Sequence, residues 1–265
     1  MGGSLSGKRV LILGASAGIG RALAVRAVRE GAQVLMAARR AAELDKAADE
    51  AGGGHPVSVD VRDPEDCARL ATAARETLGQ IDVLVSSVGA ARVRRIADTD
   101  ADDWRHAFET NVIGFHQPLR CCLPVLAPGA IVMALSSEGV DQPRSALGSY
   151  VTSKVALERM LVAWRTEHPE IRFCRVRVGQ TFPTEFGLAF DSDTLTRAMD
   201  DWAARGLAQE EFMTPEDVAG VLVGVIRTAT DHPGICLEEL TVRSASAVTA
   251  TYEQAVTDAT GQDGP

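Results

Sequence analysis

Short apolar runs alternate with longer segments of helical periodicity along most of the chain, and this alternation restricts the fold more than any other feature. Seven strands are expected, at Lys8–Leu13, Gln33–Ala38, Pro56–Asp60, Asp82–Ser86, Ala130–Ser136, Ile171–Val178 and Leu237–Val242. Apolar strands separated by helices are typical of parallel strands buried on both faces. The sequence therefore predicts a doubly wound α/β fold with about seven parallel strands and helices on both faces of the sheet.

The segments between these strands predict helices, and no linker of domain scale interrupts the pattern. The helices are expected at Gly18–Glu30, Ala41–Ala51, Pro64–Leu78, Asp102–Leu123, Ser149–Glu167, Thr194–Arg205 and Pro215–Thr228. We expect residues 1–265 to form one domain, in which the polar tail 244–265 is frayed.

Charge and residue content exclude several classes of protein. The formal net charge of −9 argues against a nucleic-acid or anionic membrane surface. Five cysteines, an odd number without a Cys-x-x-Cys pair, favour reduced thiols and a cytoplasmic protein. The five histidines are scattered, so no metal site is expected. No apolar run reaches the roughly 18 residues that a transmembrane helix needs.

A glycine-rich turn, Gly14-Ala15-Ser16-Ala17-Gly18-Ile19-Gly20, follows the first expected strand. Glycines in such a turn let the backbone approach a pyrophosphate at the N-terminus of the next helix. An ordinary strand-to-helix turn is the alternative. Its place in the first βαβ unit favours a dinucleotide site, with contacts from Gly14, Ser16, Gly18, Ile19 and Gly20.

Tyr150 and Lys154 lie four residues apart on an expected helix, hence on one face of it. A free tyrosine titrates near 10, whereas a general acid–base group works nearer the ambient pH. An ammonium about 5 Å away, at an effective dielectric of ~20, lowers the pKa of a phenol by about 2.4. The pair therefore predicts acid–base chemistry, although a surface ion pair beside a half-buried tyrosine is the alternative.

The Gly-x-x-x-Gly-x-Gly spacing of the turn, together with Tyr150-Val-Thr-Ser-Lys154, resembles the short-chain dehydrogenase/reductase family. The resemblance covers roughly Leu5 to Arg243. It implies a Rossmann-type domain that binds a nicotinamide dinucleotide and transfers hydride between the nicotinamide and a carbonyl or secondary alcohol. It also implies a homodimer or homotetramer, formed through the helices 102–123 and 149–167.

The same resemblance implies a catalytic set of Asn111, Ser137, Tyr150 and Lys154. Ser137, thirteen residues before Tyr150, would bond the substrate oxygen, while Ser136 would point away if strand alternation persists. Asn111 would hold a water that connects Lys154 to solvent. Alternatively, Asn111 is a helix-interior asparagine that bonds its own backbone.

The end of the second strand indicates which cofactor is used. Ala38 occupies the position where relatives that use NAD usually carry aspartate. Arg39, followed by Arg40, offers a guanidinium suited to the 2′-phosphate of NADP, and Ser16 could add a hydrogen bond. The alternative is a solvated helix start. NADP(H) is therefore the expected cofactor, with NAD less favoured.

Further cofactor contacts implied by the resemblance are Asp60, Val61, Gly89, Gly179 and Thr184. Asp60 would bond the adenine, or would instead cap the segment that follows it. The chain departs from the family pattern at Ser86-Ser87, where asparagines are usual, and at Val178, where proline is usual.

Residues 181–213 are expected to lie over the site and form a substrate lid. Its bulky apolar residues are Phe182, Phe186, Leu188, Phe190, Leu195, Met199, Trp202, Leu207 and Phe212. If they face inward, an apolar ketone, steroid-like or acyl-chain substrate is expected; plain packing is the alternative. Two other functions remain open: a non-catalytic NADP-binding sensor or scaffold, and a nucleotide-sugar epimerase or dehydratase of the extended branch.

Overall fold

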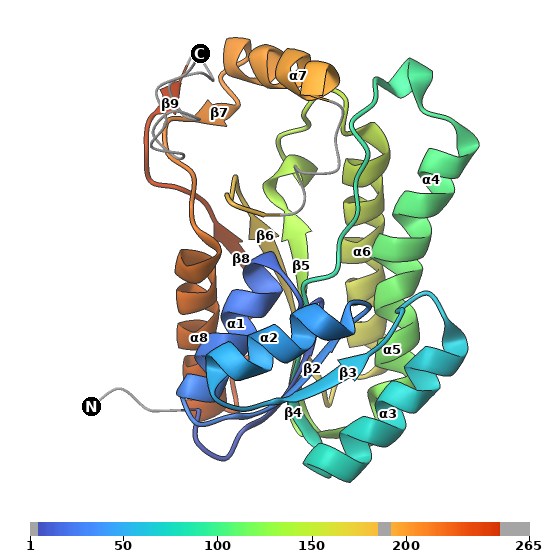
Figure 1. Cartoon of the computed structure of the whole chain (residues 1–265), viewed down its shortest axis with the longest axis vertical. Coiled ribbons are helices and arrows are strands. Elements are labelled where there is room, and N and C mark those ends of the chain that lie inside the picture. Colours follow the sequence, from blue (N-terminus) through green and yellow to red (C-terminus); the bar gives the residue numbers. More distant parts are fainter. Residues whose placement is uncertain (1–4, 185–191, 250–265) are drawn as a thin grey trace.

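A computed structural model describes residues 5–184 and 192–249, and its centre is a seven-stranded sheet (Figure 1). The strands are β1 (Arg9–Leu13), β2 (Gln33–Ala38), β3 (His55–Ser58), β4 (Ile81–Ser86), β5 (Leu126–Ser137), β6 (Arg172–Val178) and β8 (Glu239–Val242). They pair in parallel in the order β3-β2-β1-β4-β5-β6-β8, which confirms the predicted fold class.

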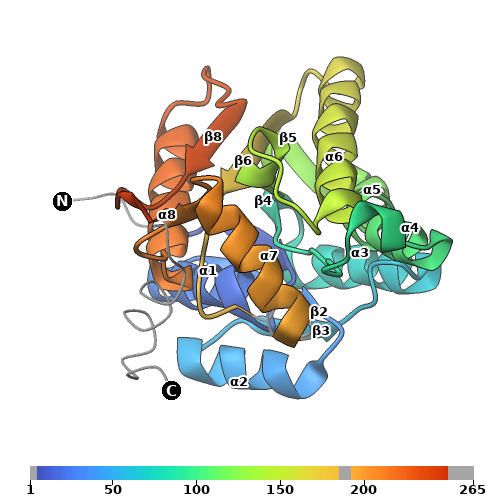
Figure 2. The same ribbon diagram turned by 90° about the horizontal axis from the view of Figure 1, so that it is seen from above.

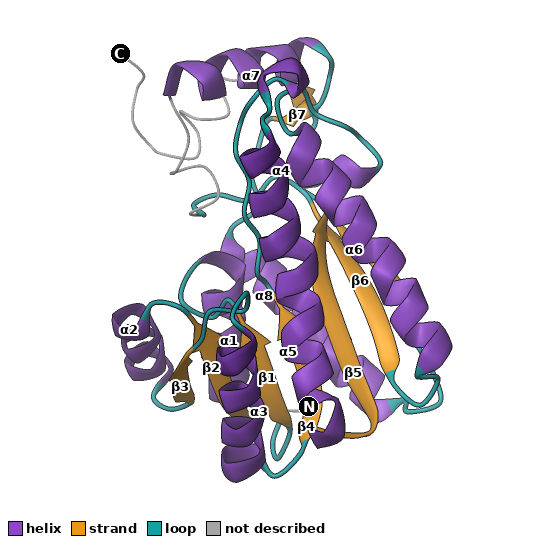
Figure 3. Cartoon of the chain, turned by 90° about the vertical axis from the view of Figure 1, so that its right-hand side faces the viewer, coloured by secondary structure: helices purple, strands orange, loops and turns teal. Residues whose placement is uncertain are grey.

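Helices cover both faces of this sheet (Figures 1 and 3). Their bounds are α1 (Gly18–Arg29), α2 (Ala41–Ala51), α3 (Pro64–Leu78), α4 (Ala101–Phe108), α5 (Gly114–Cys122), α6 (Gly148–Glu167), α7 (Ser192–Ala204) and α8 (Pro215–Asp231). One apolar layer joins the sheet to α1, α2 and α8, and the other joins it to α3, α5 and α6. Burial on both faces explains why the strands read as continuous apolar runs.

The long helix expected over Asp102–Leu123 is interrupted. A π-helical turn, η2 (Glu109–Ile113), separates α4 from α5 and contains Asn111. Close packing accompanies the break, because a Cβ at Gly114 would lie 2.8 Å from Cγ2 of Val61. Such turns are frequent at functional sites.

A second, two-stranded sheet was not expected from the sequence. β7 (Ala208–Gln209) and β9 (Val248–Thr249) pair antiparallel, so two residues of the expected tail form a strand. Residues 250–265 of that tail lie outside the described residues. Two-residue strands carry no readable periodicity, which is why the sequence did not indicate them.

α7 crosses over the carboxyl ends of the central strands (Figures 1 and 2). The strand order reverses between β1 and β4, which lie side by side. From β1 the sheet continues through β2 and β3 in one direction, and from β4 it continues through β5 in the other. Ligands of open parallel sheets bind at such a reversal of strand order. None of the helices within 5–184 and 192–249 is long and apolar enough to cross a membrane.

Strand β5 carries one irregularity in its pairing with β4. Ile81 pairs with Leu126, but Val83 pairs with Ile131, so extra β5 residues are accommodated between the two pairs. From Ile131 to Ser137 the pairing with β6 is continuous.

Candidate active site

A cleft of about 890 Å³ opens at the carboxyl edge of the sheet. The glycine-rich turn, the end of β2 and the segment after β3 line one part of it. Ser137, Tyr150 and Lys154 line another part, together with several described residues of the expected lid. The cleft thus brings together motifs that are more than 130 residues apart in the sequence.

The glycine-rich turn is packed so closely that larger side chains would not fit. A Cβ at Gly20 would lie 2.2 Å from the carbonyl oxygen of Gly14, and one at Gly14 would lie 3.0 Å from the carbonyl carbon of Ser87. Gly14 and Gly18 also have positive φ, of 82° and 51°. With α1 beginning at Gly18, the turn and the helix N-terminus fit a dinucleotide pyrophosphate.

The end of β2 presents two arginines to the cleft. Arg39 and Arg40 are both exposed and both line it. The guanidinium of Arg40 donates to Oγ of Ser16 at 3.0 Å. Ser16 and Arg40 are therefore held together in the cleft, while a bond from Ser16 to the 2′-phosphate stays a prediction.

Asp60 and Val61 line the cleft beyond these arginines. Both carboxylate oxygens of Asp60 accept from the guanidinium of Arg62, at 2.6–3.2 Å. These bonds lower the pKa of Asp60 to about 2. Asp60 is thus held as an anion in the cleft wall, while its contact with adenine stays a prediction.

Ser137 and Tyr150 meet in the cleft. Ser137 ends β5, and its hydroxyl is hydrogen-bonded to the side chain of Tyr150. Oγ of Ser137 also accepts from the backbone N–H of Gly139 at 3.1 Å. Burial raises the pKa of Tyr150 to about 12, against the lowering effects of the Ser137 bond and the charge of Arg144. Tyr150 is therefore a neutral phenol at ordinary pH.

Lys154 lies one helical turn from Tyr150 and is buried. Its Nζ donates to the carbonyl oxygens of Leu135 at 2.8 Å and Val88 at 3.3 Å, and lies 5.8 Å from the centre of the Tyr150 ring. Burial lowers the pKa of Lys154 to about 8, while the carboxylate of Glu158 acts in the opposite direction.

The estimate from the sequence, in which the ammonium of Lys154 supplies most of the lowering of the Tyr150 pKa, does not include the burial of the two groups. That estimate counted the attraction between a cation and a phenolate four residues apart. Both groups are buried, however, and loss of solvent disfavours both charged forms. The spacing in the sequence gives the distance between the two groups but not their desolvation.

Asn111 is buried in the π-helical turn and turns toward the loop after β4. Its Oδ1 accepts from the backbone N–H of Ala90 at 2.7 Å, and its Nδ2 donates to the carbonyl of Ala90 and to Oγ of Ser153. A Cβ at Gly89 would lie 3.4 Å from Nζ of Lys154 and 3.9 Å from Oδ1 of Asn111. The structure therefore brings Gly89, Asn111 and Lys154 together; a water held by Asn111 stays a prediction.

Gly179 and Thr184 also line the cleft. The backbone N–H of Gly179 donates to the carbonyl of Val242 at 2.8 Å, which fixes the exit of β6 against β8. A Cβ at Gly18 would lie 3.7 Å from Cγ2 of Thr184, so this loop closes over the glycine-rich turn. Both residues lie where a bound dinucleotide would be expected.

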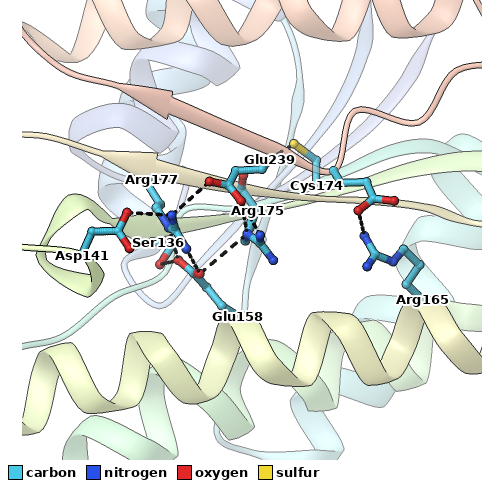
Figure 4. A network of polar contacts seen from close by, with 9 residues as sticks. Ser136, Asp141, Glu158, Arg165, Cys174, Arg175, Arg177 and Glu239 are labelled. Carbon is cyan, nitrogen blue, oxygen red and sulfur yellow. Dashed lines mark hydrogen bonds and ion pairs between the residues drawn. The ribbon is translucent and has the colours of Figure 1, made fainter.

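The hydroxyl of Ser136 points to Glu158 of α6 and belongs to a network of charges between the sheet and α6 (Figure 4). Its hydroxyl donates to Glu158 Oε1 at 2.7 Å. Arg177 donates to the same carboxylate from Nε at 2.9 Å and from Nη2 at 2.7 Å. The network continues to Arg175, Asp141 and Glu239.

The sequence did not indicate two charged residues of the cleft wall, Glu138 and Arg144. Nη2 of Arg144 donates to Glu138 at 2.5 Å and to the carbonyl of Leu207 at 3.0 Å. Both side chains are buried. A single acid and a single arginine in a polar loop look like ordinary surface residues, so no local signal could have identified them.

The described part of the lid contributes apolar side chains to the cleft, namely Phe182, Leu195, Met199, Trp202 and Phe212. The rings of Phe182 and Phe212 lie 6.2 Å apart, and Nε1 of Trp202 donates to the carbonyl of Ser145 at 2.9 Å. This arrangement favours the inward-facing alternative over plain packing. Phe186, Leu188 and Phe190 lie outside the described residues.

A family model described as short chain dehydrogenase matches residues 8–192. This chain belongs to the short-chain dehydrogenase/reductase family. A glycine betaine reductase, ATRR, of Emericella nidulans is 33% identical to it over 233 residues. The match covers 85% of this chain but only 18% of ATRR, so this short-chain dehydrogenase corresponds to a small part of that relative.

Solved structures of similar fold cover nearly the whole short-chain dehydrogenase. An alcohol dehydrogenase from the archaeon Thermococcus sibiricus, complexed with 5-hydroxy-NADP, matches 90% of this chain and 97% of its own, with a TM-score of 0.76 and 24% identity. A 7α-hydroxysteroid dehydrogenase complexed with NADH and 7-oxo glycochenodeoxycholic acid matches 94% and 98%, with a TM-score of 0.79 and 21% identity. At these identities the comparison shows the fold.

Proposed function

We propose that this short-chain dehydrogenase is an NADP(H)-dependent oxidoreductase that transfers hydride between the nicotinamide and a carbonyl or secondary alcohol. One observation carries the proposal. The cleft that contains the glycine-rich turn also contains the Ser137–Tyr150 hydrogen bond and the buried Lys154. A dinucleotide bound along the turn would therefore have its reactive end near an acid–base group.

Each residue of the site has a distinct proposed role. The bound dinucleotide supplies or accepts the hydride. Ser137 and Tyr150 bond the substrate oxygen, and Tyr150 gives its proton to that oxygen in the direction of reduction. Because the pKa of Tyr150 is about 12, the phenol carries this proton at neutral pH, which supports the acid role. Lys154 and a water held by Asn111 would return a proton to Tyr150.

The preference for NADP(H) rests on the end of β2. Ala38 offers no carboxylate to a ribose hydroxyl, and Arg39 and Arg40 line the cleft just beyond it. The alcohol dehydrogenase of Thermococcus sibiricus was solved with an NADP derivative and the hydroxysteroid enzyme with NADH, so the fold accommodates both. Replacing both arginines by glutamine should weaken NADPH binding more than NADH binding. Equal losses for the two cofactors would contradict this preference.

The substrate class follows from the apolar wall. Five bulky apolar residues of the lid segment line the cleft, which suits an apolar ketone, a steroid-like ketone or an acyl chain. The 7α-hydroxysteroid dehydrogenase of similar fold was solved with 7-oxo glycochenodeoxycholic acid, a ligand of this kind.

The decisive experiment measures NADPH oxidation with a panel of ketones that ranges from charged sugars to steroid-like compounds. We expect turnover with apolar members. Tyr150→Phe should bind NADPH with nearly unchanged affinity, measured by nucleotide fluorescence, yet lose almost all turnover. Full activity in that variant would rule out the role of Tyr150. Tight NADPH binding by the unmodified protein without turnover on any ketone would favour the non-catalytic sensor.

We also propose assembly into dimers or tetramers through the α4–α5 stretch and α6. Ile113 and Val155, which are exposed on these segments, are apolar groups that such an interface would cover. Light scattering of the purified protein tests this; a monomer at micromolar concentration would contradict it.

A further inference from the structure

An ion pair between Glu138 and Arg144 lies in the cleft wall, and the proposed reaction does not use it. Both residues line the cleft, and their side chains are only 4% and 7% exposed. Glu138 follows Ser137 directly in the chain. A Cβ at Gly179 would lie 3.1 Å from Oε2 of Glu138, so the carboxylate packs against the exit of β6. The pair therefore belongs to the part of the cleft that contains Ser137, where the substrate is expected.

The guanidinium of Arg144 is only partly bonded. Its Nη2 donates to Oε1 of Glu138 at 2.5 Å and to the carbonyl oxygen of Leu207 at 3.0 Å. Nε is buried and has no hydrogen-bond partner, and within the described part of the chain Nη1 has none either. Unlike Nε, Nη1 is not fully enclosed by protein. Because Arg144 lines the cleft, Nη1 can donate to a ligand there.

Arg144 belongs to a loop that is held from two sides. The carbonyl oxygen of Ser145 accepts from Nε1 of Trp202 at 2.9 Å, which ties the loop to α7. The carbonyl oxygen of Ala146 accepts from the backbone N–H of Arg94 at 2.9 Å, which ties it to the segment before α4. The guanidinium is therefore in place before a ligand binds, and less entropy is lost on binding.

The local charge favours an anionic ligand. Nε of the half-exposed Arg243 lies 3.7 Å from Oε2 of Glu138, while Oε1 pairs with Arg144. One carboxylate thus faces two guanidinium groups, which leaves an excess of one positive charge. Enclosure of Arg144 reduces the screening of this charge by solvent.

The other arginines and the lysine that line the cleft are committed elsewhere. Arg39, Arg40 and Arg62 lie at the end of β2 and after β3, in the part proposed for the dinucleotide. Nζ of Lys154 donates to two backbone carbonyls. Among the described residues of the cleft, Arg144 is therefore the guanidinium or ammonium best placed to meet the substrate.

We propose that Arg144 binds a carboxylate of the substrate, which makes the substrate an apolar keto acid, or the corresponding hydroxy acid. The inference rests on the proposed function and narrows its substrate class. The ketone oxygen would bond Ser137 and Tyr150, and the apolar body would contact the side chains of the lid. The carboxylate would accept a charge-assisted hydrogen bond from Nη1 of Arg144.

A pair of unreactive probes tests this inference without turnover. 4-Phenylbutanoate and the neutral 4-phenylbutanamide have the same apolar body and differ in charge. Their affinities for the protein are measured by isothermal titration calorimetry in the presence of NADP⁺. The parent protein should bind the carboxylate about tenfold more tightly than the amide, which is the effect of one hydrogen bond between charged groups.

The variants assign this preference to one side chain. Arg144→Gln should reduce the ratio of the two affinities to about twofold or less. The matched control is Arg243→Gln, which removes the other guanidinium next to Glu138 but does not line the cleft. This variant should keep the preference, because Arg243 is 45% exposed. If Arg144→Gln does not fold, the combined change Glu138→Gln and Arg144→Gln takes its place, since it leaves no unpaired buried charge.

Three results would overturn the inference: no preference of the parent for the carboxylate, a preference that persists without Arg144, and an equal loss in Arg243→Gln. These outcomes are separate from that of the proposed function. A carboxylate preference that depends on Arg144, without turnover of any ketone or keto acid, would leave the binding site in place and refute the oxidoreductase. Turnover of ketones without that preference would refute the binding site alone.

Discussion

Replacing Glu158 by glutamine is expected to lower the free energy of unfolding by about 3 kcal/mol. The side chain of Glu158 is 8% exposed, and its carboxylate accepts from Ser136 and twice from Arg177. Glutamine could keep the bond from Ser136, but its amide group would place N–H donors against those of Arg177. Removing one partner of a buried ion pair costs roughly 3–5 kcal/mol.

The lower end of that range applies because Arg177 keeps two other partners. It remains bonded to Asp141 at 2.7 Å and to Glu239 at 3.0 Å. The matched control is Glu239→Gln, which removes a carboxylate of the same network. Its side chain is 39% exposed, so its loss should cost about 1 kcal/mol or less.

Urea unfolding of the two variants and the parent protein measures both values, provided that the dependence on denaturant is the same for all three. Both carboxylates pair with Arg175 and Arg177, so the two variants differ in the burial of the carboxylate and in the bond that Ser136 donates to Glu158. Equal losses in the two variants would refute the reasoning, and so would a loss below about 1 kcal/mol in Glu158→Gln.

Two further predictions concern the site. The pKa of Lys154 is about 8 in the folded chain against an ordinary 10.5, so between these values the unfolded chain holds a proton that the folded chain has released. The burial of Lys154 therefore lowers the free energy of unfolding by its full amount below pH 8, and this free energy rises as the pH increases from 8 to 10. Lys154→Met should make the free energy of unfolding depend less on pH over that range. Gly20→Ala should abolish nucleotide binding in a fluorescence titration, because its Cβ would lie 2.2 Å from a carbonyl oxygen. Gly224→Ala, in α8 with open space around its Cβ, should instead stabilise by about 0.5–1 kcal/mol; a loss there would contradict the argument.

Much of the fold could be predicted because the burial of each strand and helix determines the pattern of apolar residues within that element. A run such as Val34 to Ala38 is apolar throughout, since both of its faces are covered. The seven strands of the main sheet therefore follow from the sequence, and the family resemblance supplied the expected site residues. The π-helical turn at Asn111 could not be predicted, because it accompanies contacts with Ala90 and Val61, which are distant in the chain.

The electrostatics of the site could be predicted only in part. Sequence spacing shows that Tyr150 and Lys154 share one face of a helix, and the family resemblance indicates Ser137 as a further residue of the site. It does not show that α7 and the loop before α6 remove both groups from solvent, or that a second cation, Arg144, is enclosed with them. Desolvation and enclosure depend on the assembled tertiary structure.

The uneven pairing of β5 with β4 indicates where this chain could accommodate an insertion or a deletion. The extra residues lie between Leu126 and Ile131, at the end of the strand remote from Ser137. An insertion or deletion near Gly129 could therefore be accommodated in this unpaired part of β5, without a change in the register of the residues from Ile131 onward. A slip by one residue further along would put Leu135 at the position of Ser136, which would remove the donor of the ionic network, or would put Glu138 at the position of Ser137, which would remove the hydroxyl of the cleft.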